Sequence, residues 1–70
     1  MIQVNQNFIT TRLKSGFSLR ALATAAGLSY GAVLHAEHGG AVTPKNARKM
    51  CDALDVDFDE LFVIVEETDG

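Results

Sequence analysis

Apolar residues recur along the chain at the three- and four-residue spacing of helices, in short blocks separated by glycine, serine or proline. This pattern predicts five helices, at about residues 6–15, 19–26, 30–38, 44–54 and 58–62. Alternation over residues 2–5 and the β-branched run Val63-Ile64-Val65 predict a short strand at each end, at residues 2–5 and 63–66. We expect the two strands to pair. The predicted fold class is therefore all-α, with a small terminal β-element.

Side chains that cap helices mark where several of these blocks begin. Ser18, Ser29 and Thr43 each stand where a hydroxyl can accept a hydrogen bond from a free amide of the first helical turn. Residues 57–60 show a capping-box pattern, with an acid at the cap and glutamate three residues later. Gly27 suits the left-handed residue that ends a helix. These signals support helices that begin near residues 19, 30, 44 and 58.

The apolar stripes of the predicted helices define a core. Its expected members are Leu22, Ala23, Ala26, Val33, Ala36, Ala47, Met50, Cys51 and Leu54. Cys51 lies within such a stripe, so it is interpreted as a core residue and not as a nucleophile. A two-stranded ribbon is marginal in water, so Ile2, Val4 and Ile64 are expected to pack on the helical body, unless the strands pair across a dimer.

Size and composition exclude several functional classes. A chain of 70 residues makes one domain, residues 1–70, and buries only about 60% of its unfolded surface, which leaves no room for a deep catalytic cleft. We expect no enzyme activity, because no acid–base pair or phosphate-binding glycine loop is present. His35 and His38 lack a third ligand nearby, so no metal or cofactor is expected. No apolar run could span a bilayer, no signal peptide is evident, and the lone cysteine suits the cytoplasm.

The formal net charge of −3 hides an uneven distribution. Residues 1–50 hold all six basic residues and one acid, a net of +5, whereas residues 51–70 hold eight acids and no lysine or arginine. The field near a surface follows local charge more than the total. The chain can therefore present a basic side to nucleic acid and keep an acidic end away from it.

Residues 18–39 combine two short helices with a glycine-containing turn, which is the helix-turn-helix arrangement. In this arrangement the second helix enters the major groove of DNA and the first braces it. Further landmarks follow in order along the chain: Arg12, Gly16-Phe17-Ser18, Leu22-Ala23, Gly27-Leu28-Ser29, Val33, Glu37, Gly39, Ala53-Leu54-Asp55-Val56 and Asp59-Glu60-Leu61-Phe62. With these landmarks the sequence resembles the lambda-repressor-like (Cro- and Xre-type) helix-turn-helix proteins over about residues 7–62.

The resemblance implies a five-helix lambda-repressor-like domain and a sequence-specific transcriptional regulator. Such proteins are often repressors of phage, plasmid or mobile-element operons, and they bind palindromic double-stranded DNA as homodimers. By position, the resemblance implies base-facing roles for Tyr30, Gly31, Ala32 and His35, and phosphate contacts for Ser29, Arg20, Thr43 and Lys45. It also implies a salt bridge between Arg12 and Glu37. No small-molecule effector is expected, because a chain of this size has no separate sensing domain.

Some positions depart from the family pattern. Leu19 stands where the family often has a glutamine that grips DNA, the third helix holds no lysine or arginine, and Gly31 and Ala32 replace polar readers. The loop over residues 39–42 also lacks basic residues. We therefore expect modest affinity for a single site. Two alternatives stay open: a protein-interaction module on a helix-turn-helix scaffold with weak or lost DNA binding, and a DNA-binding excision or assembly factor.

Overall fold

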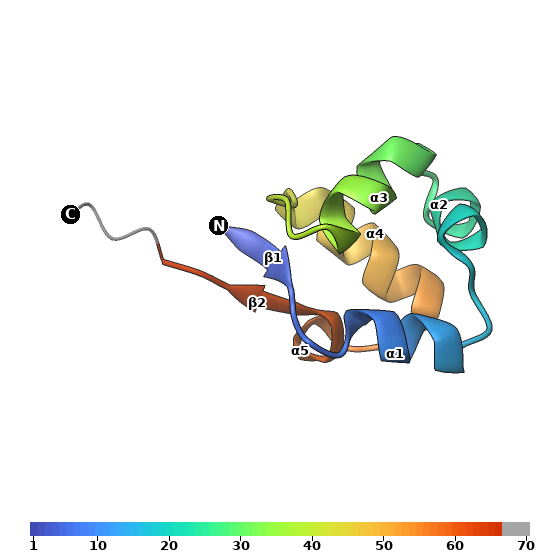
Figure 1. Cartoon of the computed structure of the whole chain (residues 1–70), viewed down its shortest axis with the longest axis horizontal. Coiled ribbons are helices and arrows are strands. Elements are labelled where there is room, and N and C mark those ends of the chain that lie inside the picture. The colour runs from blue at the N-terminus through green and yellow to red at the C-terminus, as the bar shows by residue number, and fades with distance from the viewer. Residues whose placement is uncertain (67–70) are drawn as a thin grey trace.

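The computed structural model describes residues 1–66 and confirms the predicted order of elements (Figure 1). The elements are β1 (Ile2–Val4), α1 (Phe8–Lys14), α2 (Leu19–Ala26), α3 (Tyr30–Glu37), α4 (Pro44–Leu54), α5 (Phe58–Leu61) and β2 (Phe62–Ile64). The first helix begins two residues later than predicted, because Asn5 forms a tight turn before it. The Asn5 side chain accepts a hydrogen bond from the Asn7 N–H at 2.8 Å, and the Asn5 carbonyl accepts one from the Phe8 N–H at 3.2 Å.

The predicted capping residues act as caps. The hydroxyl oxygens of Ser18, Ser29 and Thr43 accept hydrogen bonds from backbone N–H groups three residues later, at 3.0, 3.1 and 3.1 Å. The Asp57 N–H donates to the Glu60 carboxylate at 3.1 Å, as in a capping box. These bonds satisfy amides that would otherwise have no partner in the first helical turn. The beginnings of α2, α3, α4 and α5 are thus determined locally.

The core lies between α2, α3 and α4, with α1 and α5 closing one end (Figure 1). All nine residues expected from the apolar stripes are buried. Four more residues complete the core: Phe8, Val42, Leu61 and Phe62. Contrary to the prediction, Phe62 does not end a helix but begins β2, and its ring lies 6.1 Å from that of Phe8 and 5.6 Å from that of Phe58, measured between centroids. This aromatic cluster holds α1, α5 and the sheet together.

The two terminal strands pair, as predicted. β1 and β2 are antiparallel, with Ile2 opposite Ile64, Gln3 opposite Val63 and Val4 opposite Phe62. On its other side Ile2 bridges to Val42, whose N–H donates to the Ile2 carbonyl at 2.8 Å. β1 therefore lies between β2 and the residues that precede α4.

One expectation about the strands is wrong. Ile2 and Val4 pack against the core, but the Ile64 side chain is 66% exposed. β2 runs away from α5 and the other helices (Figure 1), and its last residue, Ile64, is exposed. The second strand also begins one residue earlier and ends two residues earlier than predicted.

Candidate nucleic-acid interface

The turn between α2 and α3 has the geometry of a helix-turn-helix. Gly27 adopts a left-handed conformation (φ 70°) and ends α2. The Leu28 N–H donates to the Ala23 carbonyl at 2.9 Å, and the Leu28 side chain packs against the core. Ser29 then caps α3. Three residues between the helices, anchored by a backbone bond and an apolar contact, hold α3 at a defined angle to α2.

The outer side of α3 carries the residues predicted to face bases. Val33 and Ala36 point into the core, whereas Tyr30, Gly31 and His35 are not buried in it. Ala32 is half-buried, so only part of its surface could reach a ligand. The helix therefore presents a phenol and an imidazole, with Gly31 and the half-buried Leu34 between them.

Arg20 and Tyr30 form a contact that the sequence did not indicate. The guanidinium carbon of Arg20 lies 4.9 Å from the centroid of the Tyr30 ring, within the range of a cation–π interaction. The resemblance assigns Arg20 to a phosphate and Tyr30 to bases, and the fold brings the two residues together where α2 and α3 begin. Arg20 is therefore oriented by the first side chain of α3.

His35 lies against the loop that follows α3. A Cβ atom built on Gly40 would clash with the His35 ring at Nε2, so the imidazole occupies the space that a side chain at position 40 would need. The Gly40 N–H also donates to the His35 carbonyl at 2.9 Å. By position, the resemblance gives Gly40 a phosphate contact, and no sequence signal indicates its contact with His35. The structure shows that Gly40 leaves room for the His35 ring.

The predicted phosphate-contacting hydroxyls already serve as helix caps. Ser29 and Thr43 each accept a hydrogen bond from a backbone amide through the side-chain oxygen. A hydroxyl that accepts such a bond can still donate its own hydrogen to a phosphate oxygen. Lys45 is exposed in the first turn of α4, two residues after Thr43. Capping is thus compatible with the predicted role of these residues.

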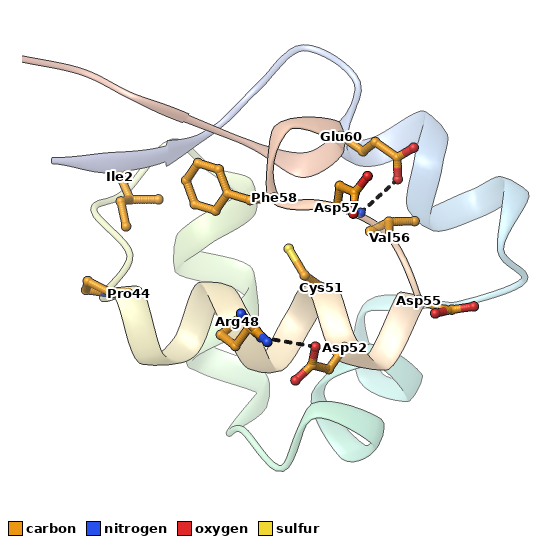
Figure 2. Close-up of a pocket in the computed structure, with 10 residues that line it drawn as sticks. All are labelled: Ile2, Pro44, Arg48, Cys51, Asp52, Asp55, Val56, Asp57, Phe58 and Glu60. Carbon is orange, nitrogen blue, oxygen red and sulfur yellow. Dashed lines mark hydrogen bonds and ion pairs between the residues drawn. The ribbon is translucent and has the colours of Figure 1, made fainter.

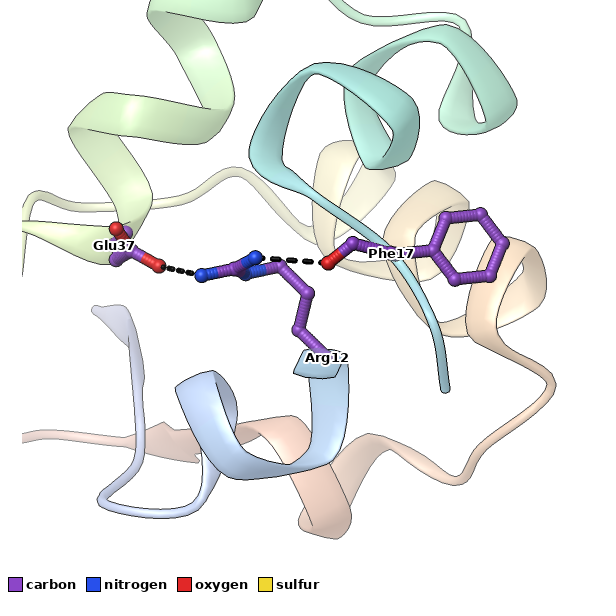
Figure 3. A network of polar contacts seen from close by, with 3 residues as sticks. All are labelled: Arg12, Phe17 and Glu37. Atoms are coloured by element: carbon purple, nitrogen blue, oxygen red, sulfur yellow. Dashed lines mark hydrogen bonds and ion pairs between the residues drawn. The ribbon is translucent and has the colours of Figure 1, made fainter. Parts of the chain in front are cut away.

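Arg12 and Glu37 form the ion pair that the resemblance implied (Figure 3). The Arg12 Nη2 lies 2.9 Å from the Glu37 Oε1, and the Arg12 Nη1 donates to the Phe17 carbonyl at 2.8 Å. The two side chains are 8% and 14% exposed. Within residues 1–66, the buried Arg12 Nε has no hydrogen-bond partner. The pair connects α1, the loop before α2 and the last turn of α3, so it fixes the position of α3.

A separate groove of about 590 Å³ opens between α4 and α5 (Figure 2). Ile2, Cys51, Val56 and Phe58 supply its apolar lining, and its carboxylates are Asp52, Asp55, Asp57 and Glu60. Burial raises the pKa of the Cys51 thiol, and the neighbouring Asp52 carboxylate adds to this effect. Four carboxylates and one cation, Arg48, line the groove, so it carries negative charge and repels phosphates.

The fold and the exposed side of α3 define a helix-turn-helix domain, the class of protein that reads DNA with its second helix. The helix-turn-helix family model HTH_3, which is of the Cro/C1 type, matches residues 10–61, and the chain belongs to this family of DNA-binding regulators. Comparison with curated proteins and with solved structures gives no significant match. Among the described residues, no helix is long and apolar enough to cross a membrane.

Proposed function

We propose that the chain is a sequence-specific transcriptional regulator of the cytoplasm that binds double-stranded DNA as a homodimer. It represses an operon of the phage, plasmid or mobile-element type, with no small-molecule effector and no catalytic activity. The observation that carries the proposal is the Arg20–Tyr30 contact. It places a cation, suited to a phosphate, directly beside the first side chain of the exposed helix. Such an arrangement suits a helix lying in the major groove with its neighbour against the backbone.

In this proposal, reading of bases falls to few side chains. The Tyr30 hydroxyl and the His35 imidazole can exchange hydrogen bonds with base edges, and Ala32 can contact a thymine methyl group. Gly31 allows the helix backbone to approach the groove closely. Arg20 and Lys45 neutralise phosphates, and the hydroxyls of Ser29 and Thr43 donate to others. Because α3 carries no lysine or arginine, one domain on one half-site binds modestly, and two adjacent half-sites are needed for tight binding.

The decisive experiment begins with selection of bound duplexes from a random pool, which yields the preferred site and its half-site spacing. Fluorescence anisotropy on that duplex and on a scrambled one then separates the two groups of residues. Arg20→Ala and Lys45→Ala should weaken binding to both duplexes, and each should lower the salt slope by about one unit, because one phosphate is no longer neutralised. Lys14→Ala, a change of an exposed lysine on α1, is the matched control. It should change neither the affinity for either duplex nor the salt slope.

Two substitutions of Tyr30 separate its hydroxyl from its ring. Tyr30→Phe keeps the surface on which Arg20 stacks and removes only the hydroxyl, so it should relax selectivity and preserve the salt slope. Tyr30→Ala removes both and should also weaken binding to the scrambled duplex. His35→Ala should cost roughly 1–3 kcal/mol on the preferred duplex only. Selection that enriches no sequence, together with unchanged affinity in all these variants, would refute the proposal.

Two observations favour a second candidate function, a protein-interaction module. The exposed side of α3 lacks lysine and arginine, and the groove of Figure 2, away from that helix, combines apolar side chains with carboxylates. Under this alternative the chain binds a protein target with little dependence on salt and shows no salt-dependent shift of duplex DNA.

A further inference from the structure

The loop over residues 39–42, between α3 and α4, has little chemistry of its own with which to hold DNA. It contains two glycines and no charged side chain, although the resemblance gives a phosphate contact to Gly40. Glycine loses more conformational freedom than any other residue when its backbone is ordered. A loop of this composition therefore contributes most to binding when its conformation is already set in the free protein.

The first strand holds this loop at both ends. The Gln3 Nε2 donates to the Gly39 carbonyl at 3.0 Å, and the Val42 N–H donates to the Ile2 carbonyl at 2.8 Å. β1 can do this because it lies between β2 and the loop (Figure 1). The middle of the loop is thus bracketed by two hydrogen bonds to the terminal sheet.

The peptide group that joins Gly39 to Gly40 is fixed on both sides. Its carbonyl accepts from Gln3, and its N–H donates to the His35 carbonyl of α3 at 2.9 Å. Because a peptide group is planar and rigid, a rotation of its plane would break both bonds together. Gly39 reaches this orientation through a left-handed conformation (φ 91°), which glycine adopts without strain. Gln3 and α3 together therefore set the plane of this peptide group.

This peptide group also bears on the position of the His35 ring. The ring lies against Gly40, in the space that a Cβ atom at position 40 would need. His35 is otherwise exposed, and contact with the loop restricts the rotamers of its ring. A shift of the peptide group would therefore change the space that is open to the imidazole.

We propose that Gln3 is a positioning residue for DNA recognition. Its amide fixes the loop after α3, and through the loop it fixes the His35 ring and the approach of the chain to Thr43 and Lys45. The inference rests on the proposed function, which assigns these groups to bases and phosphates. Gln3 lies outside the residues 10–61 that match the family model. The terminal strand thus adds to the family's fold a part that orders the loop before DNA is bound.

Nuclear magnetic resonance of the free chain tests the hold on the loop with two matched variants. Gln3→Met keeps the length of the side chain and removes its hydrogen-bond donor. Gln6→Met makes the same change at an exposed glutamine in the turn before α1 and is the control. In Gln3→Met the Gly40 amide should exchange its hydrogen roughly two- to fivefold faster than in the wild type, because the lost bond is exposed and lies at the weaker end of the usual range.

The His35 ring proton shifts should move in Gln3→Met as well. In Gln6→Met neither the exchange nor the ring shifts should change. Thermal unfolding checks that both variants fold. Exchange and ring shifts that stay as in the wild type in Gln3→Met would overturn the proposal.

Fluorescence anisotropy on the selected duplex tests the consequence for DNA. Gln3→Met should weaken binding roughly two- to fivefold and keep the salt slope, because no phosphate contact is lost. The double variant Gln3→Met with His35→Ala should lose less than the product of the two single losses, because part of the Gln3 effect passes through the His35 ring. Losses that simply multiply would show that Gln3 acts without the ring, and would overturn the positioning role.

The same measurements separate this proposal from the proposed function. A wild type that binds no duplex refutes the regulator, and the positioning role with it, even where Gln3 holds the loop in the free chain. A wild type that binds the selected duplex only as well as Gln3→Met does refutes the positioning role and leaves the regulator standing.

Discussion

Replacing Glu37 by glutamine tests the electrostatics that position α3. The change keeps the shape of the side chain and removes the negative charge that faces the Arg12 guanidinium at 2.9 Å. Arg12 is 7% exposed, and its Nε has no hydrogen-bond partner among the described residues. After the substitution its remaining acceptors there are neutral: the Phe17 carbonyl and the amide oxygen introduced at position 37. Glu37→Gln therefore leaves a buried cation without a counter-charge.

The expected cost follows from the burial of the pair. Removing one partner of a fully buried ion pair destabilises a protein by about 3–5 kcal/mol. The Glu37 side chain is 14% exposed, so water relieves part of this cost. We expect Glu37→Gln to lower the free energy of unfolding by roughly 2–4 kcal/mol. A domain of this size has a stability near the lower end of about 5–15 kcal/mol. The variant should thus lose much of its stability, with a fall in Tm of roughly 10–30 °C.

Urea unfolding followed by circular dichroism measures this cost against a control on the same chain. The exposed pair of Arg48 and Asp52, 3.3 Å apart with side chains 80% and 70% exposed, provides it. Asp52→Asn should cost less than about 0.5 kcal/mol. The double variant Arg12→Met with Glu37→Gln should be more stable than Glu37→Gln alone, because no charge is left unpaired. A Glu37→Gln variant that loses no more stability than Asp52→Asn would contradict the reasoning.

Three further outcomes are expected. Leu22→Ala should lower the free energy of unfolding in urea by roughly 2–5 kcal/mol, because Leu22 of α2 is fully buried in the core. An unchanged urea midpoint would show that Leu22 does not contribute to the core. Gly40→Ala should displace the His35 ring, since a Cβ at position 40 would clash with it. It should lower affinity for the selected duplex without unfolding the domain. Imidazole proton shifts report the displacement, and fluorescence anisotropy measures the affinity. Because the pKa of the Cys51 thiol is raised in the folded state, the thiol ionises first in the unfolded state. The wild type should therefore lose stability as the pH rises from the thiol pKa of the unfolded state through that of the folded state. Cys51→Ala should lack this alkaline decline when urea midpoints are compared across pH.

The sequence by itself determined the features that depend on neighbours within one or two helical turns. Ser18, Ser29 and Thr43 could be identified as caps because each acts on an amide three residues later. The buried stripes followed from helical spacing, and the left-handed Gly27 from its place at a helix end. The landmarks of the family added the Arg12–Glu37 pair, which spacing alone could not have joined, because its members stand 25 residues apart.

Only the tertiary structure decided which distant residues meet. The stacking of Arg20 on Tyr30 depends on the angle between two helices, and the packing of His35 over Gly40 depends on the path of a loop. The exposure of Ile64 depends on where the helical body ends beneath the strand. An apolar pattern shows that a residue is suited to burial, but burial also needs a surface to pack against. At Ile64 the described part of the chain provides none, and the residue stays exposed.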